Sequence, residues 1–225
     1  MTNFRKVVLA NDQIYHIFNR AIDRQTIFNT RWEYGRAVEA FRFCRFADLP
    51  FRFSHLLNLP EGDRQRVIQD LNQNKEKLVD IIAFCIMPNH FHFILKQLKD
   101  NGISKFISNF TNSYTKYFNT KHERKGHLFE GLFKAVLVET DEQLIHLSRY
   151  IHLNPVASFL VKVGDLENHP WSSFPEYLNL TSDNLCQKEV VLGYFSSIEA
   201  YKQFVLDQVK YAQELEKIKH LLIET

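Results

Sequence analysis

The sequence predicts an α+β protein with a ferredoxin-like β-α-β-β-α-β sheet domain, a further helix after the last strand and a helical C-terminal extension. Two observations predict it: segments with a hydrophobic period of two alternate with segments of period 3.6, and turn or capping signals separate them. With 225 residues, of which 45% are hydrophobic, the chain can fill one sizeable core, so a mostly disordered chain is excluded.

The first third of the chain predicts a strand, a helix and an insertion. Residues 13–22 (QIYHIFNRAI) indicate a strand that leads into a loop. Residues 30–46 carry apolar side chains three and four positions apart, and Thr30 is placed to cap this helix. Residues 47–77 mix Pro-containing and strongly polar stretches, which indicates a surface insertion with a short helix and no chemistry.

A strand pair and the most regular helix of the chain follow. Residues 77–87 (KLVDIIAFCIM) form a β-rich buried run, residues 88–89 are a Pro-Asn turn signal, and residues 90–96 alternate as a second strand. Between residues 103 and 118 the apolar side chains recur at i, i+3, i+4 and i+7. This pattern predicts an amphipathic helix.

The last strand leads directly into another helix. After a basic connector, residues 131–139 (GLFKAVLVE) indicate a strand. Residues 140–155 then predict a helix that opens with Thr140 and Gln143 in capping-box spacing. We expect this helix to end at Pro155, because proline disfavours helical geometry in the residue before it.

The domain organisation follows from this order of elements. We expect one domain over residues 1–178, with residues 47–77 as its insertion, and a helical extension over residues 179–225. The remainder after residue 155 carries two further helices, the last over residues 198–222.

Composition excludes several classes of protein. The net charge of +2 is too small to indicate a nucleic-acid partner by itself. Cys44, Cys85 and Cys186 are widely spaced and form no CxxC pair, so neither a disulfide framework nor a cysteine zinc site is expected. No apolar run approaches the ~18 residues of a membrane span, and the first residues lack a signal-peptide pattern. We expect a cytoplasmic protein without a membrane partner.

Two histidines interrupt the apolar strand CIMPNHFHFIL. His90 and His92 are separated by one residue, so in a strand both side chains project from the same face. Two imidazoles on one face are typical of a divalent metal site with a third ligand from elsewhere. The pattern alone fits a pair of partly exposed strand histidines equally well.

A polar edge follows the helix of residues 140–155. Tyr150 and Asn154 lie one turn apart on it, and His146 precedes Tyr150 by one turn on the same line. A phenol on such an edge can reach solvent or a substrate. Taken alone, a tyrosine at the boundary of the core more often has a packed ring and a solvated hydroxyl.

Five segments together resemble one known family: MPNHFHFIL, YHIFNRA, GHLFEGLFKAVLV, RYIHLNPVASFLV and HPWSSFPEYL. They are similar to segments of the HUH single-tyrosine transposases, and most of all to the branch called REP-associated tyrosine transposases, from about residue 15 to residue 178. The resemblance implies that His90 and His92 bind a divalent metal ion, Mg²⁺ or Mn²⁺, with Asn154 as third ligand. It also implies that Tyr150 attacks DNA from a catalytic helix, and His146 is the candidate residue to assist it.

The implied activity is cleavage and rejoining of single-stranded DNA near hairpins through a 5′-phosphotyrosine intermediate. The implied partner is a hairpin of a repetitive palindromic element, bound by a monomer or a homodimer in the nucleoid-associated cytoplasm. Each basic side chain, taken alone, is equally an ordinary solvated residue. The candidate contacts to the DNA backbone are Lys105, Lys116, Lys121, Arg124, Lys125, Lys134 and Arg149.

Two other functions remain open. A zinc metallohydrolase would use His90 and His92 with His146 or His152 to activate water, and it would not need Tyr150. The lack of an acidic residue beside the histidine pair counts against it. A non-catalytic hairpin-binding protein derived from a transposase is the other alternative. Only the transposase predicts a covalent adduct between protein and DNA.

Overall fold

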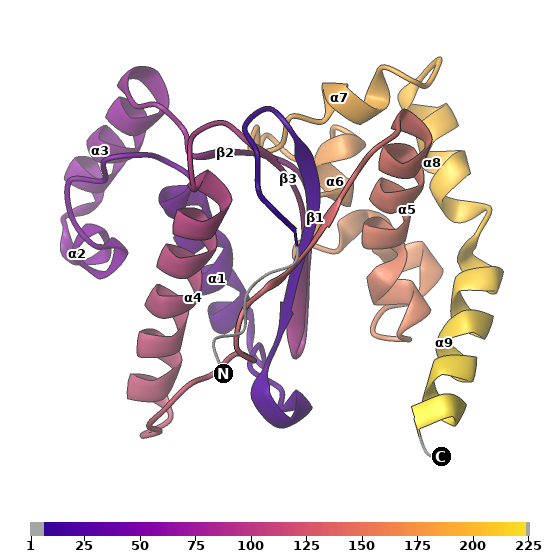
Figure 1. The fold of residues 1–225 in the computed structure, drawn as a ribbon, viewed down its shortest axis with the longest axis horizontal. Coiled ribbons are helices and arrows are strands. Elements are labelled where there is room, and N and C mark those ends of the chain that lie inside the picture. The colour runs from indigo at the N-terminus through magenta and orange to yellow at the C-terminus, as the bar shows by residue number, and fades with distance from the viewer. Residues whose placement is uncertain (1–6, 224–225) are drawn as a thin grey trace. The chain divides into compact units, whose positions relative to one another are not determined.

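A four-stranded sheet is central to the computed structural model, which describes residues 7–223. Its strands are β1 (Ile14–Arg20), β2 (Val79–Met87), β3 (His90–Gln97) and β4 (Lys134–Leu137). They lie in the order β2-β3-β1-β4, and β1 pairs antiparallel with β4. The α+β class predicted from the sequence is thereby confirmed (Figure 1).

The helices alternate with these strands and then make up the last third of the chain. None of those in the described residues has the length and apolarity needed to cross a membrane. The elements are η1 (Ile22–Arg24), α1 (Arg31–Cys44), α2 (Phe53–Asn58), α3 (Glu61–Asn74), α4 (Gly102–Lys121), α5 (Asp141–Ala157), η2 (Val163–Asn168), α6 (Phe174–Tyr177), α7 (Glu189–Leu192), α8 (Ile198–Leu206) and α9 (Val209–Ile223).

The last strand is shorter than the predicted residues 131–139. Phe18 of β1 pairs with Lys134, and the next bridge joins Ala21 to Phe129. Three steps along β1 therefore match five steps along its partner, so the partner segment holds two extra residues and bulges between these pairs. The bulge, which the hydrophobic pattern does not reveal, ends the regular pairing of β4.

Two compact units divide the described residues. The first takes the residues up to Asp80 together with Pro88–His90 and Leu95–Leu137. The second takes Ile81–Met87, Phe91–Ile94 and the residues from Val138 onward. The expected limits at residues 178 and 179 stay a prediction.

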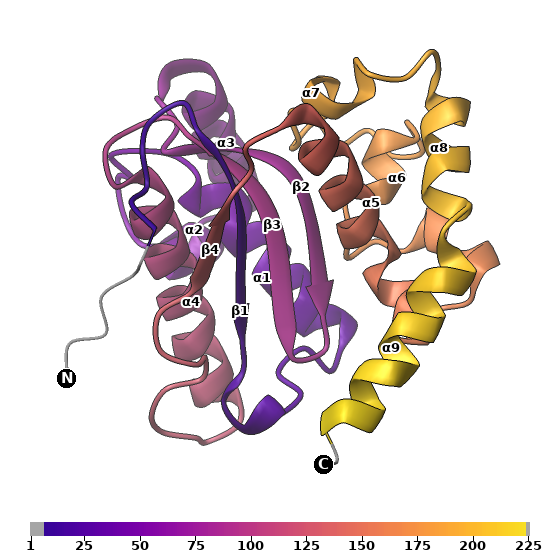
Figure 2. The same cartoon turned by 45° about the vertical axis from the view of Figure 1, so that its right-hand side comes forward.

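In the first unit α1 and α4 lie side by side (Figures 1 and 2). The Phe41 and Phe110 rings meet edge to face, with centroids 5.9 Å apart. Thr30 caps α1 through a reciprocal capping box with Glu33, as the sequence predicts for the start of this helix. The periodic side chains of α4 are buried from Ile103 to Phe118, which confirms the helix with the most regular pattern.

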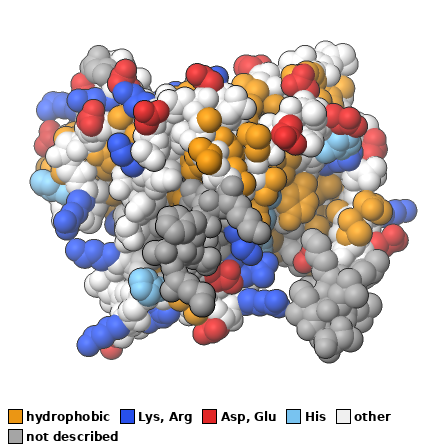
Figure 3. All heavy atoms as spheres, in the orientation of Figure 1, with side chains coloured by type: hydrophobic (Ala, Val, Ile, Leu, Met, Phe, Trp, Pro, Cys, Tyr) orange, Lys and Arg blue, Asp and Glu red, His pale blue; other side chains and the backbone are white. Residues whose placement is uncertain are grey.

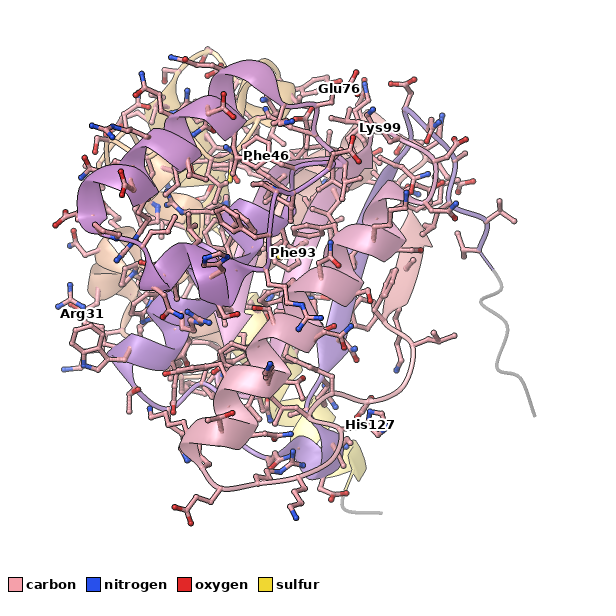
Figure 4. The ribbon with its side chains drawn as sticks, turned by 90° about the vertical axis from the view of Figure 1, so that its left-hand side faces the viewer. Arg31, Phe46, Glu76, Phe93, Lys99 and His127 are labelled. Atoms are coloured by element: carbon pink, nitrogen blue, oxygen red, sulfur yellow. The ribbon has the colours of Figure 1, made fainter. Side chains whose placement is uncertain are left out.

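The insertion contains two helices, α2 and α3, instead of the single short helix predicted. Its ends meet, because Phe46 and Lys77 form an isolated antiparallel bridge. Next to this bridge the Glu76 carboxylate pairs with the Lys99 ammonium group, and Figure 4 shows the two side chains together. The prediction gave no bounds for its one helix, and α2 has only 6 residues, too few to show a helical period in the sequence.

In the second unit α8 and α9 both pack on α5 (Figure 2). The segment before α6 pairs antiparallel with β2. Ser172 bridges to Cys85, and the Ile86 amide donates to the Trp171 carbonyl at 2.8 Å. The single helix predicted over residues 198–222 is two helices, α8 and α9. The break falls at residues 207–208, where α8 has ended.

The helix α5 continues for two residues beyond Pro155, where the sequence predicted its end. Proline removes one intrahelical donor, but the next turn is supported by Ser158, whose amide and hydroxyl both donate to the Asn154 carbonyl. Asn154 is therefore helical, and it keeps its place one turn after Tyr150.

Candidate active site

Tyr150 lies in the middle of α5, on a helix whose start is fixed by its sequence. The Thr140 hydroxyl accepts a hydrogen bond from the Gln143 amide at 3.1 Å, and the Gln143 side chain accepts from the Glu139 amide at 2.8 Å. Leu144 and Ile151 anchor the opposite, buried side of the helix. The Tyr150 side chain is left 41% exposed, which is open enough to meet a substrate.

The imidazole of His92 lies against the Tyr150 ring within the second unit. The two ring centroids are 5.6 Å apart and the planes are nearly perpendicular, at 86°. His92 is only 6% exposed, since strand β3 is buried along most of its length. A nearly buried nitrogen base and a half-exposed phenol thus adjoin, although 58 positions separate them in the sequence.

His90, two positions earlier on β3, belongs to the first unit and has its own partner there. Its Nδ1 lies 2.6 Å from the Asn89 Oδ1. The Asn89 amide nitrogen donates to the Arg24 carbonyl at 3.0 Å, so Oδ1 is the Asn89 atom that faces the imidazole. His90 Nδ1 must then carry the proton, which makes Nε2 the nitrogen with the lone pair in this tautomer.

Asn154 presents one oxygen for a ligand. Its side-chain amide nitrogen donates to the backbone carbonyl of Tyr150 at 3.0 Å, which leaves the carboxamide Oδ1 as the atom that can accept. This contact spans one helical turn, so the side chains of Asn154 and Tyr150 lie on the same line along α5, as the sequence predicted.

The predicted metal ligands are imidazole and carboxamide groups, which are donor types that divalent cations accept. Within residues 7–223, His, Cys, Asp and Glu side chains form no cluster of three or more that could hold a metal. His90 belongs to the first unit and His92 and Asn154 to the second, and the metal site stays a prediction. The bond between His90 and Asn89 is the kind of outer contact that orients a metal-binding imidazole.

His146 and Arg149 form a packed cluster with α8. The Arg149 guanidinium lies 4.2 Å from the Phe204 ring centroid and 2.7 Å from His146 Nδ1. Partial burial lowers the pKa of Arg149, and the carboxylate of Asp207 opposes this effect. Both residues were predicted to act on DNA or on Tyr150, and both contribute to the packing of α5 on α8.

The other predicted DNA contacts divide into two groups. Lys121 and Arg124 are engaged at the end of α4: the Lys121 ammonium lies 2.7 Å from the Glu33 carboxylate, and Arg124 donates to the Asn119 side chain at 2.9 Å. The remaining four are exposed, and Figure 3 shows basic side chains along the side of the molecule where α4 lies. They are Lys105, Lys116, Lys125 and Lys134.

A buried hydrogen-bond network beside Tyr150 was not predicted from the sequence. His152, considered only as a zinc ligand, is fully buried, and its two ring nitrogens each lie 2.7 Å from a hydroxyl, that of Ser173 and that of Tyr201. Burial lowers its pKa to about 3, so the ring is neutral. With both nitrogens engaged, His152 does not have the free lone pair that the metallohydrolase alternative requires.

Part of the chain matches the model of a known protein family. A family model described as "Transposase IS200 like" matches residues 61–154, a range that contains His90, His92, Tyr150 and Asn154. This segment is similar to the IS200-like transposases. The resemblance to single-tyrosine transposases inferred from the sequence is thereby confirmed.

A solved structure shares the fold of this chain. It is described as the REP-associated tyrosine transposase bound to a REP hairpin. The match has a TM-score of 0.50 at 16% sequence identity and covers 80% of this chain and 86% of the other. Curated proteins, by contrast, include none that matches the chain significantly.

Proposed function

We propose that this protein is a metal-dependent transposase that cleaves and rejoins single-stranded DNA beside hairpins. One observation carries the proposal: Tyr150 adjoins His92 within the segment that matches the IS200-like transposases. An exposed phenol next to a histidine supports this proposal, because a tyrosine nucleophile needs access to its substrate and can be assisted by a metal ion.

The DNA partner is inferred from the shared fold. The solved structure of that fold is described as bound to a REP hairpin, so a hairpin with a single-stranded flank is the substrate we propose here. The lysines Lys105, Lys116 and Lys125 of α4 and its connector are exposed, and we propose that they contact the phosphate backbone. Such a protein would act in the cytoplasm, at the nucleoid.

The reaction is a transfer of one phosphodiester bond. The Tyr150 hydroxyl oxygen attacks the phosphorus and loses its proton, and the bond from phosphorus to the 3′ oxygen breaks. This oxygen takes up a proton and leaves as a free 3′-hydroxyl, while the 5′ phosphate stays joined to Tyr150. Rejoining reverses these steps with another 3′-hydroxyl, and no other energy source is needed.

We propose that the residues implied by the family resemblance, His90, His92 and Asn154, would hold the cation. When bound, Mg²⁺ or Mn²⁺ neutralises charge on the phosphate oxygens, which otherwise repel the nucleophile. Asn89 orients His90 through their 2.6 Å contact, and α5 carries Tyr150 and Asn154 as one rigid element.

The test is the covalent adduct. Full-length protein is incubated with Mg²⁺ and single-stranded hairpin DNA labelled on the strand segment 3′ to the cleavage position, and the products are separated on a denaturing gel. We expect a labelled protein band with the wild type and none with Tyr150→Phe, whereas the hairpin affinity of this variant stays the same.

Tyrosines of α4 provide matched controls. Tyr114 is fully buried and its hydroxyl donates to the Ile27 carbonyl at 2.6 Å, and Tyr117 is half-buried beneath the Arg36 guanidinium. Tyr114→Phe and Tyr117→Phe should still form the adduct. An adduct that persists in Tyr150→Phe and disappears in one of these controls would assign the nucleophile to that tyrosine instead.

A further inference from the structure

His152 lies on α5 two positions after Tyr150, on the buried side of the helix. Its Nε2 is 2.7 Å from Ser173 Oγ and its Nδ1 is 2.7 Å from the Tyr201 hydroxyl. Both hydroxyl-bearing residues are themselves buried, at 1% and 0% exposure. Burial of three polar groups is costly unless every donor and acceptor is paired, so the geometry of this network is narrowly defined.

The Ser173 hydroxyl also meets the backbone of Phe84. It accepts a hydrogen bond from the Phe84 amide at 2.9 Å and lies 3.2 Å from the Phe84 carbonyl. Of the two nitrogens of a neutral imidazole one donates and the other accepts, so His152 donates to one of its two hydroxyl partners and accepts from the other. Both ring nitrogens of the neutral imidazole are thereby paired.

The network joins three elements of the second unit. Ser173 connects it to the backbone of β2 at Phe84, and Tyr201 connects it to α8. The Tyr201 hydroxyl also lies 3.1 Å from the Ser148 hydroxyl, which donates to the Ile145 carbonyl of α5 at 2.7 Å. Helix α5 is thus held by directional bonds at residues 148 and 152, on either side of Tyr150.

We propose that His152, Ser173 and Tyr201 are positioning residues for the Tyr150 nucleophile. The inference rests on the proposed function and extends it to the C-terminal segment, because Tyr201 lies in α8. Apolar packing alone permits small slides and rotations of a helix, whereas hydrogen bonds restrict them. A displacement of about 1 Å at a reacting group can cost about 10²-fold in rate, so these bonds matter for the chemical step.

Tyr201→Phe in the full-length protein tests this inference most directly. It keeps the ring and removes the hydroxyl that bonds to His152 and Ser148. With Mg²⁺ and saturating hairpin DNA, we expect the single-turnover rate of adduct formation to fall by about 10- to 100-fold. The hairpin affinity should stay within about twofold, because no DNA contact is removed.

Tyr177→Phe is the matched control. Tyr177 is as buried as Tyr201, and its hydroxyl donates to the Ile82 carbonyl of β2 at 2.8 Å, but this bond does not involve α5. Both variants lose one buried hydroxyl, so both are expected to melt at a lower temperature. Only Tyr201→Phe should lose adduct rate when both are assayed well below their melting temperatures.

Substitution at His152 provides a second test that is independent of Tyr201. His152→Gln keeps an N–H that can donate to Ser173, whereas His152→Ala keeps no polar atom. We expect the adduct rate to decrease from wild type to His152→Gln to His152→Ala, with hairpin affinity retained in each folded variant. This order separates hydrogen bonding from the volume of the side chain.

The outcomes separate this inference from the proposed function. If wild-type protein forms an adduct and folded Tyr201→Phe or His152→Gln forms it at the same rate, the network contributes only to stability and the inference is wrong. An equal loss of rate in Tyr177→Phe would also overturn it. If the wild type forms no adduct, the proposed function fails, and the positioning role fails with it.

Discussion

The imidazole of His92 and the ring of Tyr150 meet nearly edge to face, at 86° and with centroids 5.6 Å apart. Strand β3 supplies one partner and helix α5 the other. The contact places a buried imidazole next to a half-exposed phenol ring, and in the proposed mechanism it makes His92 the residue that connects a bound cation with the nucleophile.

Substitution of His92 should separate the contribution of its ring packing from the contribution of its nitrogen atoms to cleavage. His92→Phe retains an aromatic edge against Tyr150 but has no lone pair, so we expect at least a ~10²-fold loss of cleavage from a fold that survives, comparable to the loss of one stabilising group in an active site. Cleavage of a labelled hairpin and circular dichroism measure the two properties. Normal cleavage by this variant would show that His92 is needed only for packing.

Removal of the Asn89 side chain should weaken metal binding without touching a ligand. Its Oδ1 orients His90 at 2.6 Å, and loss of such outer contacts typically lowers metal affinity by about 10- to 100-fold. We expect this loss in Asn89→Ala, measured as the Kd for Mn²⁺ by calorimetry or electron paramagnetic resonance. Asn89→Asp keeps the acceptor and is the control, which should bind Mn²⁺ at least as tightly as the wild type.

Chelation should separate the proposed transposase from a zinc hydrolase. After treatment with EDTA we expect no adduct, and we expect Mg²⁺ or Mn²⁺ to restore it, because the cation neutralises the phosphate charge. The gel assay with labelled hairpin measures this. Restoration by Zn²⁺ alone, with turnover that persists in Tyr150→Phe, would instead support the hydrolase.

Substitution of an exposed basic side chain and of a packed one should change the salt dependence of hairpin binding by different amounts. Lys125 is exposed, so Lys125→Ala should weaken hairpin binding and lower the magnitude of the slope of log K against log salt concentration by about 0.7, the value for one phosphate on a single strand. Binding titrations from low to moderate salt measure this. A slope equal to that of the wild type would mean that Lys125 does not contact a phosphate.

Arg149 provides the contrast to Lys125. Its guanidinium packs on Phe204 and lies beside His146, so Arg149→Ala should lower the melting temperature and leave the salt slope unchanged. Thermal unfolding and the same titrations compare the two variants. A change in slope as large as that of Lys125→Ala would show that Arg149 contacts a DNA phosphate.

Acid should destabilise the first unit through Glu33. Burial by itself raises the pKa of this carboxyl, but hydrogen bonds from Lys121, His122 and the Asn29 backbone outweigh it and lower the pKa from 4.5 to about 2. The unfolded state therefore binds its proton first as the pH falls. The stabilisation is complete above pH 4.5 and is lost as the pH falls toward 2.

Glu33→Gln isolates this contribution. At pH 7 we expect its free energy of unfolding to be about 1–3 kcal/mol below that of the wild type, because charged hydrogen bonds are lost. The difference should shrink between pH 4.5 and pH 2. Denaturant unfolding at a series of pH values measures it, and a difference that stays constant over this range would contradict the assignment.

Local sequence determined the elements that have strong periodic patterns. The apolar repeat of α4 predicted its buried face, including Tyr114, and the spacing of Thr140 and Gln143 predicted the start of α5. It also placed Tyr150 and Asn154 on one helical line and suggested a histidine pair on β3. These features depend on hydrophobic periods of 3.6 residues in helices and 2 residues in strands, which can be recognised in the sequence without knowing how the elements pack.

Only the tertiary structure decided which side chains meet. Arg149 was predicted as a DNA contact from its charge alone, and the structure shows that it packs on Phe204. No motif singled out Tyr201, which bonds to His152 two positions after Tyr150. Local periodicity sets the face on which a residue lies. The partner on that face comes from a segment about 50 positions away, and the packing of whole helices and strands selects it.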